Sequence, residues 1–185
     1  MKEIEDENII SLLKSSQESE RGFRLLLQKY QEKLYYHIRR IASDHEDAND
    51  ILQNTLIKVF KNIHSFEGKS QFFTWLYRIA TNESLTFLTQ RKKRTTASLD
   101  DSQGASSTIQ EAEHYVDMDN FAQKLESIIE RLPEKQRLVF KMRYYDEMKY
   151  EEISEILDIS VGGLKASYHH AVKKIESYIT NSTIL

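Results

Sequence analysis

Residues that break helices are almost missing from this chain, which has one proline and five glycines among its 185 residues. Inside a helix, proline costs about 3 kcal/mol and glycine about 1 kcal/mol relative to alanine, so their scarcity leaves long stretches free to be helical. Leu, Lys, Glu and Gln are common, and all four favour helices. We therefore predict an all-α protein.

Several classes of site and location are excluded by composition. The chain has no cysteine, which excludes disulfides, zinc–thiolate sites and cysteine nucleophiles. The N-terminal sequence MKEIEDENIISLLKSSQ is acidic and amphipathic, unlike a signal peptide. No apolar run approaches the roughly 18 residues that a membrane span needs. We expect a cytoplasmic protein without membrane insertion.

Apolar residues recur every three or four positions in the N-terminal half, which is the period of an amphipathic helix. This spacing predicts helices over residues 21–42, 45–63 and about 70–93, with the sequence SFEGKS as a loop before the third. Ser43 or Asp44 is suited to cap the second helix, and the acids that follow suit its positive N-terminal dipole. An N-terminal domain of three or four helices, residues 1–94, is expected.

Residues 95–117 show no periodicity and are rich in Ser, Thr and Asp, which predicts a flexible acidic linker. Amphipathic helices are expected after it, near residues 121–132 and from Pro133 to about Tyr145. Proline is well placed in a first helical turn, where its missing N–H costs nothing. These two helices begin a four-helix C-terminal domain, residues 118–181.

The remainder of that domain contains the sequence KYEEISEILDISVGGLKASYHHAVKKI, residues 149–175. Two helical patterns are joined there by a short turn that contains Ile159, and Asp158 tolerates the left-handed conformation that such a turn needs. This arrangement fits a helix-turn-helix, whose second helix enters the DNA major groove. An ordinary helical hairpin is the alternative.

The second helix of this motif would direct a mixed polar set outward. These residues are Ser160, Gly163, Lys165, Ala166, Ser167, His169, His170 and Lys173. Adjacent residues on a helix point about 100° apart, and no third ligand is evident beside the two histidines. We therefore expect them to face a DNA groove or solvent rather than a metal ion.

Charge is distributed unevenly along the chain, although the net charge is only −3. Residues 58–94 carry eight cations and two acids, whereas residues 95–130 carry one cation and eight acids. A basic block followed by an acidic block indicates a polyanion site beside a segment that could shield it.

Two stretches resemble a known family. The sequence DANDILQNTLIKVFKNIHSFEGKSQFFTWLYRIATNESL resembles region two of bacterial sigma factors, and LPEKQRLVFKMRYYDEMKYEEISEILDIS resembles region four. Their order and spacing resemble the extracytoplasmic-function (ECF) sigma factors over roughly residues 20–178. The resemblance implies a non-enzymatic protein without a cofactor that binds the clamp helices and flap of core RNA polymerase and recognises and melts promoter DNA. Anti-sigma partners are common in this family.

The resemblance also implies roles for individual residues. Phe66 and Asn82 match positions that line a pocket for a flipped minus-ten base, and the loop around them would set specificity. The minus-ten set is Phe66, Glu67, Lys69, Ser70, Gln71, Asn82, Arg91, Lys92, Lys93 and Arg94, the last four along the DNA backbone. Asp50, Gln53 and Asn54 match the surface that docks on the polymerase clamp. The minus-thirty-five set is Ser160, Gly163, Lys165, Ser167, His169, His170 and Lys173. Phe72 and Trp75 match core positions.

Two other functions are compatible with parts of the sequence. A stand-alone dimeric helix-turn-helix regulator would bind duplex operators without polymerase. A nucleic-acid enzyme would need metal ligands such as Asp44, Glu46, Asp47 and Asp50, but their spacing scatters them around a helix start. A solvated helix cap is the better interpretation of these acids, and the aromatic and basic segment at residues 70–94 argues against the regulator.

Overall fold

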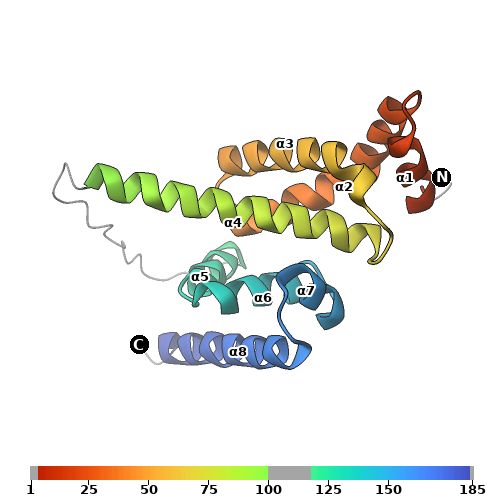
Figure 1. The fold of residues 1–185 in the computed structure, drawn as a ribbon. Coiled ribbons are helices and arrows are strands. Elements are labelled where there is room, and N and C mark those ends of the chain that lie inside the picture. Colours follow the sequence, from red (N-terminus) through yellow and green to blue (C-terminus); the bar gives the residue numbers. More distant parts are fainter. Residues whose placement is uncertain (1–3, 100–117, 184–185) are drawn as a thin grey trace. The chain divides into compact units, whose positions relative to one another are not determined.

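The computed structural model describes residues 4–99 and 118–183, and over these residues it contains helices and no strand (Figure 1). The all-α prediction is therefore confirmed. The chain divides into two compact units, Met1–Lys93 with Glu155–Leu157 and Arg94–Ser154 with Asp158–Leu185. Within the described ranges, no helix is both long and apolar enough to cross a membrane.

Four α-helices and one short 3-10 helix form the first unit. They are α1 (Asp6–Lys14), α2 (Ser19–Ala42), α3 (His45–Asn62), a 3-10 helix (Ile63–Ser65) and α4 (Phe72–Leu99). The amphipathic N-terminal sequence forms α1, which buries Ile9, Leu12 and Leu13. Of the two arrangements that the sequence left open, four helices is the one observed.

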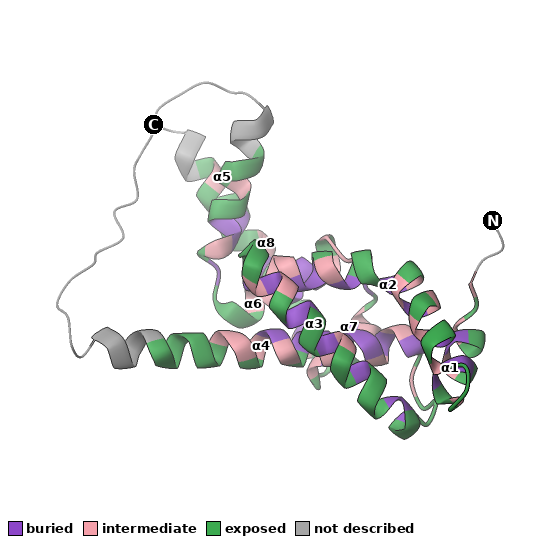
Figure 2. Cartoon of the chain, turned by 90° about the horizontal axis from the view of Figure 1, so that it is seen from above, coloured by how far each residue is buried: buried purple, intermediate pink, exposed green. Residues whose placement is uncertain are grey.

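The core of the first unit follows the predicted periodicity. α2 buries Leu26, Tyr30, Leu34 and Ile38, each four residues after the last, so that one face points inward (Figure 2). A buried polar contact joins α2 to α4, where His37 Nε2 lies 2.9 Å from the hydroxyl oxygen of Thr81. That hydroxyl donates in turn to the carbonyl oxygen of Tyr77 at 2.8 Å, so the polar atoms remain satisfied inside the core.

The junction between α2 and α3 has the capping chemistry that the sequence indicated. Ser43 takes the left-handed conformation, with φ 62°, and ends α2. The carboxylate of Asp44 accepts a hydrogen bond of 3.0 Å from the backbone N–H of Asp47. This hydrogen bond lowers the pKa of Asp44 because it favours the ionised carboxylate. Of the two candidate caps, Asp44 is the one that caps α3.

α4 is longer than the sequence predicts. It begins after the loop that contains Gly68, whose φ of 73° suits glycine, and it continues to Leu99. The start of the predicted linker at residue 95 is therefore wrong, because residues 95–99 continue the helix. The rest of the predicted acidic linker, residues 100–117, lies outside the described residues.

Four α-helices make up most of the second unit, although the last turn of α7 is grouped with the first unit. They are α5 (Met118–Glu130), α6 (Glu134–Tyr144), α7 (Tyr150–Leu157) and α8 (Val161–Thr183). One cluster of its core comprises Ile128, Ile129, Leu132, Phe140, Ala171 and Ile175. Pro133 is the N-cap of α6, one position before the first turn where the sequence placed it.

A buried cation joins α5 to α6. The Lys141 side chain is 4% exposed, and its ammonium lies 2.6 Å from Glu130 and 3.2 Å from Glu126. Arg137 adds an ion pair of 2.9 Å to Glu130. A buried ammonium persists only where carboxylates compensate for the water it has lost, so these pairs specify how α5 packs on α6.

Three residues join α7 to α8. Asp158 is left-handed, with φ 54° and ψ 45°, as the sequence allowed. The Ser160 hydroxyl oxygen then accepts a hydrogen bond of 3.3 Å from the backbone N–H of Gly163, which caps α8. A Cβ at Gly163 would lie 3.3 Å from this hydroxyl oxygen, so glycine leaves room for the cap. The turn has the form predicted for a helix-turn-helix.

Candidate nucleic-acid interface

An aromatic cluster lies beneath the loop at residues 66–71. The ring of Phe66 lies 5.5 Å from that of Phe72 and 5.2 Å from that of Trp75, and Phe66 is only 7% exposed. A ring buried in this way is not open to a base. In this structure Phe66 is buried, and Phe72 and Trp75 pack against it. The sequence could not show this, because Phe66 adjoins a polar loop.

The loop above this cluster is polar and open to solvent. Glu67, Lys69 and Gln71 are exposed and Ser70 is half-buried. Glu67 and Lys69 form an ion pair across the turn at Gly68. Both charged side chains are more than 60% exposed, so the pair contributes little to stability and can exchange for another partner.

The loop leads into an exposed polar face of α4. Asn82 is exposed, and Arg78 and Thr86, four residues before and after it, are exposed too. Residues four apart lie on the same face of a helix, so the three side chains form a row. Arg78 was missed as a site residue, although its spacing from Asn82 was a signal that could have identified it.

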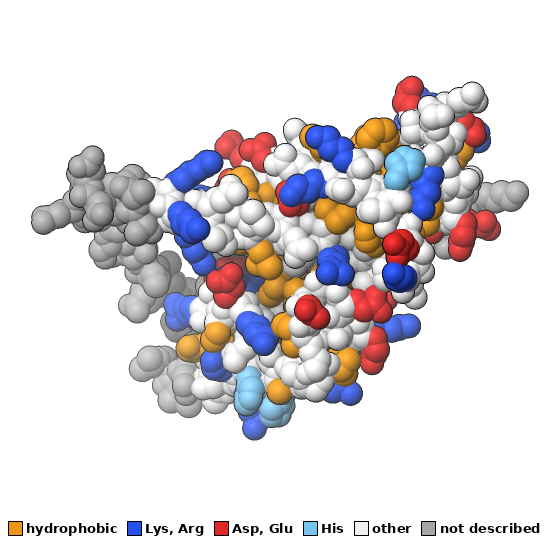
Figure 3. All heavy atoms as spheres, in the orientation of Figure 1, with side chains coloured by type: hydrophobic (Ala, Val, Ile, Leu, Met, Phe, Trp, Pro, Cys, Tyr) orange, Lys and Arg blue, Asp and Glu red, His pale blue; other side chains and the backbone are white. Residues whose placement is uncertain are grey.

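The end of α4 is basic and exposed at Arg91, Lys92, Lys93 and Arg94. Figure 3 shows Lys and Arg side chains gathered over this part of the helix. Arg91 forms an ion pair with Asp47 near the start of α3. Asp44 therefore caps α3, and Asp47 pairs with a cation from the end of α4.

A second exposed surface runs along α3. Asp50, Gln53 and Asn54 are exposed there, and so are two large apolar side chains, Ile57 at 50% and Phe60 at 43%. Positions 50, 53, 54, 57 and 60 follow helical spacing along one side of α3. Exposed apolar groups at such spacing are typical of a protein-binding surface. Neither Ile57 nor Phe60 was predicted as a contact residue, and the spacing of Phe60 from the other apolar residues of this helix also fits a core.

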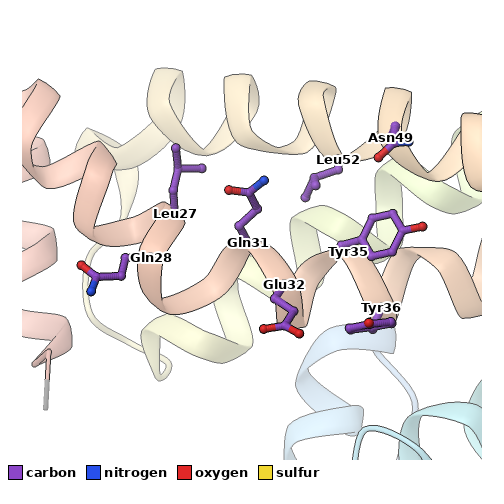
Figure 4. Close-up of a pocket in the computed structure, with 8 residues that line it drawn as sticks. All are labelled: Leu27, Gln28, Gln31, Glu32, Tyr35, Tyr36, Asn49 and Leu52. Carbon is purple, nitrogen blue, oxygen red and sulfur yellow. The ribbon is translucent and has the colours of Figure 1, made fainter. Parts of the chain in front are cut away.

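A shallow groove of about 340 Å³ lies between α2 and α3 (Figure 4). Leu27, Gln28, Gln31, Glu32, Tyr35, Tyr36, Asn49 and Leu52 line it. At its rim, the Tyr35 hydroxyl lies 2.6 Å from Nδ1 of His45, and the Asn49 side-chain nitrogen lies 3.2 Å from Nε2. The groove lies next to the exposed side of α3, because the lining residue Asn49 directly precedes Asp50 in that helix.

In the second unit, the predicted minus-thirty-five residues lie on α8 or at its start. Lys165, His169, His170 and Lys173 are exposed, and Ser167 is half-buried. Ser160 is exposed as well, and its hydroxyl oxygen also caps the helix. Below this surface, the ring of Tyr150 lies 5.8 Å from the ammonium of Lys165 and 5.5 Å from the guanidinium of Arg143. Tyr150 and Arg143 were not predicted as neighbours of the site.

Comparison with known proteins identifies the family of the chain. The family model described as Sigma-70 region 2 matches residues 26–94, and the one described as Sigma-70, region 4 matches residues 122–175. The ECF RNA polymerase sigma-E factor of Escherichia coli is 32% identical over 168 residues, which cover 86% of this chain and 87% of that protein. This chain belongs to the ECF RNA polymerase sigma factors. The corresponding factor of Haemophilus influenzae is also 32% identical, over 88% of this chain and 90% of its own length.

Solved structures show the same fold. The sigma factor RpoE of Bartonella quintana, solved with the anti-sigma factor NepR, has a TM-score of 0.68 at 23% identity, covering 86% of this chain and 98% of its own. CnrH, solved with the cytosolic domain of CnrY, has a TM-score of 0.69 at 16% identity, covering 95% and 97%. Sigma factors are non-enzymatic transcription initiation factors, and this ECF sigma factor directs promoter-specific initiation by RNA polymerase. The alternative of a stand-alone dimeric regulator is not favoured.

Proposed function

We propose that this ECF sigma factor reads and opens the minus-ten element with the loop at residues 66–71 and the exposed face of α4. The observation that carries this proposal is the continuous row of Arg78, Asn82 and Thr86 between that loop and the basic end of α4. An amide such as that of Asn82 can pair with a base edge, and the cations beyond it suit phosphates. Phe66 would support the loop from beneath rather than stack on a base.

The exposed side of α3 is the proposed contact with the polymerase clamp. Asp50, Gln53 and Asn54 supply polar contacts, and Ile57 and Phe60 supply apolar area that is open in the free protein. Exposed aromatic and aliphatic side chains flanked by polar ones are characteristic of the centre and rim of protein interfaces. Ile57→Glu should therefore abolish capture of core polymerase, whereas Glu7→Gln on α1 should leave it intact.

The exposed face of α8 is the proposed reader of the minus-thirty-five element. Lys165 and Lys173 would contact phosphates, while His169 and His170 would lie against base edges. Loss of each phosphate contact should reduce the salt dependence of DNA binding by about one unit of log–log slope. Lys165→Ala and Lys173→Ala are expected to show this reduction in polymerase holoenzyme.

Reconstitution with core RNA polymerase tests the whole proposal. The full chain, added to core polymerase with a genomic fragment library, should create new and defined start sites. Asn82→Ala should remove them, and Asn8→Ala is the matched control because Asn8 is also an exposed asparagine on a helix of the first unit. Start sites that persist undiminished in Asn82→Ala would contradict the assigned minus-ten surface. We further propose that the polymerase supplies all chemistry and that the factor works in the cytoplasm.

An anti-sigma partner is also proposed, because a sigma factor of the same fold was solved with an anti-sigma factor. The test is whether a candidate anti-sigma domain from the same genome forms a stable complex with the full chain and blocks reconstituted initiation. Continued initiation at saturating concentrations of every such domain would contradict this part of the proposal.

A further inference from the structure

We propose that Lys14, at the end of α1, is a positioning residue for the loop at residues 66–71, and that α1 thereby controls how sharply the loop discriminates among promoter bases. The inference deepens the proposed minus-ten role of this loop and rests on it. It assigns a function to α1, a helix that lies before the segment matched as Sigma-70 region 2.

The contact joins two distant parts of the sequence. The ammonium of Lys14 donates a hydrogen bond of 2.8 Å to the carbonyl oxygen of Phe66, 52 positions later. Phe66 is the residue at which the 3-10 helix ends and the loop begins. Lys14 therefore holds the first peptide group of the loop.

The loop has few other backbone restraints. Its described backbone hydrogen bonds lie at its two ends, from Phe66 N–H to the Ile63 carbonyl at 3.1 Å and from Trp75 N–H to the Gln71 carbonyl at 3.1 Å. The exposed ion pair between Glu67 and Lys69 adds little rigidity. One hydrogen bond at the base of such a loop therefore has a large share in determining its conformation.

α1 is itself held firmly against α2, so Lys14 acts from a rigid support. Gly22 lets the two helices approach so closely that a Cβ there would lie 2.6 Å from the backbone nitrogen of Leu13. At the other end of α1, Asp6 accepts a hydrogen bond of 2.7 Å from the ammonium of Lys29. Both ends of α1 are thus tied to α2.

A second route connects α1 to the same loop residue. The Tyr30 hydroxyl donates to the carboxylate of Asp6 at 2.8 Å, and the Tyr30 ring lies 5.9 Å from that of Phe72, which contacts Phe66. Burial and the hydrogen bond to Asp6 raise the pKa of Tyr30, so its hydroxyl remains a donor. Phe66 is therefore held through its carbonyl by Lys14 and through its ring by Phe72.

A loop held in one conformation loses less conformational entropy when it binds, and it tolerates mismatched bases less readily. Removing the Lys14 ammonium should loosen the loop without exposing the aromatic cluster. Two effects are expected together. The loop should open faster in the free protein, and the polymerase holoenzyme should discriminate less between preferred and disfavoured bases.

The test compares Lys14→Met with Lys14→Arg, which keeps a cationic donor, and with Lys33→Met as the matched control. Lys33 is an exposed lysine on α2 that makes no hydrogen bond or ion pair with the described residues 4–99 and 118–183. The first readout is hydrogen exchange of the Phe66 and Trp75 amides in the full-length protein, since these two N–H groups make the backbone hydrogen bonds at the ends of the loop. Lys14→Met should speed this exchange about tenfold, the factor that corresponds to about 1.4 kcal/mol, while Lys14→Arg and Lys33→Met stay near wild type.

The second readout is initiation by the holoenzyme on templates randomised across the minus-ten element. Lys14→Met should reduce the ratio between preferred and disfavoured bases severalfold, and Lys14→Arg should restore it. Gln71→Ala, a substitution within the loop, tests in the same assay whether the loop reads bases at all. Trp75 fluorescence confirms that each variant is folded, and Lys14→Gln replaces Lys14→Met if that variant is not.

The outcomes separate the inference from the proposed function. If Gln71→Ala changes base preference but Lys14→Met changes neither preference nor exchange, the loop reads DNA and the inference about Lys14 is overturned. Faster exchange with an unchanged preference overturns it equally, because the restraint would then have no part in discrimination. If Gln71→Ala leaves the preference unchanged, the minus-ten role of the loop fails and the inference fails with it.

Discussion

Gly22→Ala tests whether the close approach of α1 and α2 is a requirement of the first unit. Gly22 lies inside α2, where alanine is intrinsically better than glycine by about 1 kcal/mol. In isolation the substitution should therefore stabilise the helix. The surroundings reverse this expectation, because the new Cβ would lie 2.6 Å from the Leu13 nitrogen and 2.9 Å from both the carbonyl carbon and the Cβ of Leu12.

The magnitude follows from this overlap. An ordinary van der Waals contact begins near 3.4 Å, so α1 must retreat by about 0.8 Å, and a backbone cannot rotate away as a side chain can. Overpacking of this kind costs typically 1–3 kcal/mol and sometimes more. After subtraction of the gain in helix propensity, we expect a net loss of about 1 kcal/mol. For a domain of this size, that loss lowers Tm by roughly 4–8 °C.

Denaturant unfolding of the full chain, followed by tryptophan fluorescence, measures this change. Trp75 is the only tryptophan and lies in the first unit, so its signal reports that unit selectively. Gly162→Ala is the matched control, because Gly162 is a glycine in α8 whose added Cβ would meet nothing within 4 Å. It should leave the Trp75 transition unchanged. A Gly22→Ala protein as stable as wild type would refute the argument, since α1 would then not need its close contact with α2.

Two further predictions concern charged groups. Glu130→Ala removes a carboxylate from the buried ammonium of Lys141 and should destabilise the second unit by about 2–3 kcal/mol, whereas Lys141→Met, which removes the buried charge itself, should cost about 1 kcal/mol or less. Urea unfolding monitored by circular dichroism measures both, and an equal or larger cost for Lys141→Met would show that the ion pair is strongly stabilising. Asp44→Ala should lower the stability of the first unit at pH 7, because the backbone N–H of Asp47 holds the pKa of Asp44 below its ordinary value of 3.8. A lowered pKa contributes stability above that value and loses it as pH falls through the folded-state pKa, so the difference between Asp44→Ala and wild type should vanish in acid; a difference that persists there would exclude the ionised carboxylate as its cause.

Much of the fold could be predicted because its signals are local. Tyr30, Leu34 and Ile38 face the core at the period that a helix imposes, and Asp44 caps α3 because its carboxylate reaches an N–H three residues later. The left-handed conformation of Asp158 is also a local feature, since it depends only on the ability of aspartate to adopt that conformation and on its position in the turn. The length of α4 was underestimated because the polar sequence after Arg94 resembles a linker although its first five residues continue the helix.

The candidate site was predicted less completely, since exposure depends on what packs nearby. Phe66 and Phe60 show the two kinds of difference: an aromatic residue beside a polar loop is buried, and an aromatic residue with core-like spacing is 43% exposed. Lys141 is a third case. A lysine is ordinarily expected in contact with solvent, but here two carboxylates from α5 pair with its buried ammonium.

The sequence by itself therefore determined the helices, most of their ends, the two-domain order and the family, because these depend on contacts within a few residues or on matched motifs. The tertiary structure alone decided which aromatic rings lie inside, which face of α3 and α4 is open, and how the loop before α4 is held. The hydrogen bond from Lys14 to Phe66 shows the reason. The Lys14 ammonium and the Phe66 carbonyl are brought together only by the packing of α1 on α2 and of the aromatic cluster beneath the loop. No local sequence pattern around either residue predicts this contact.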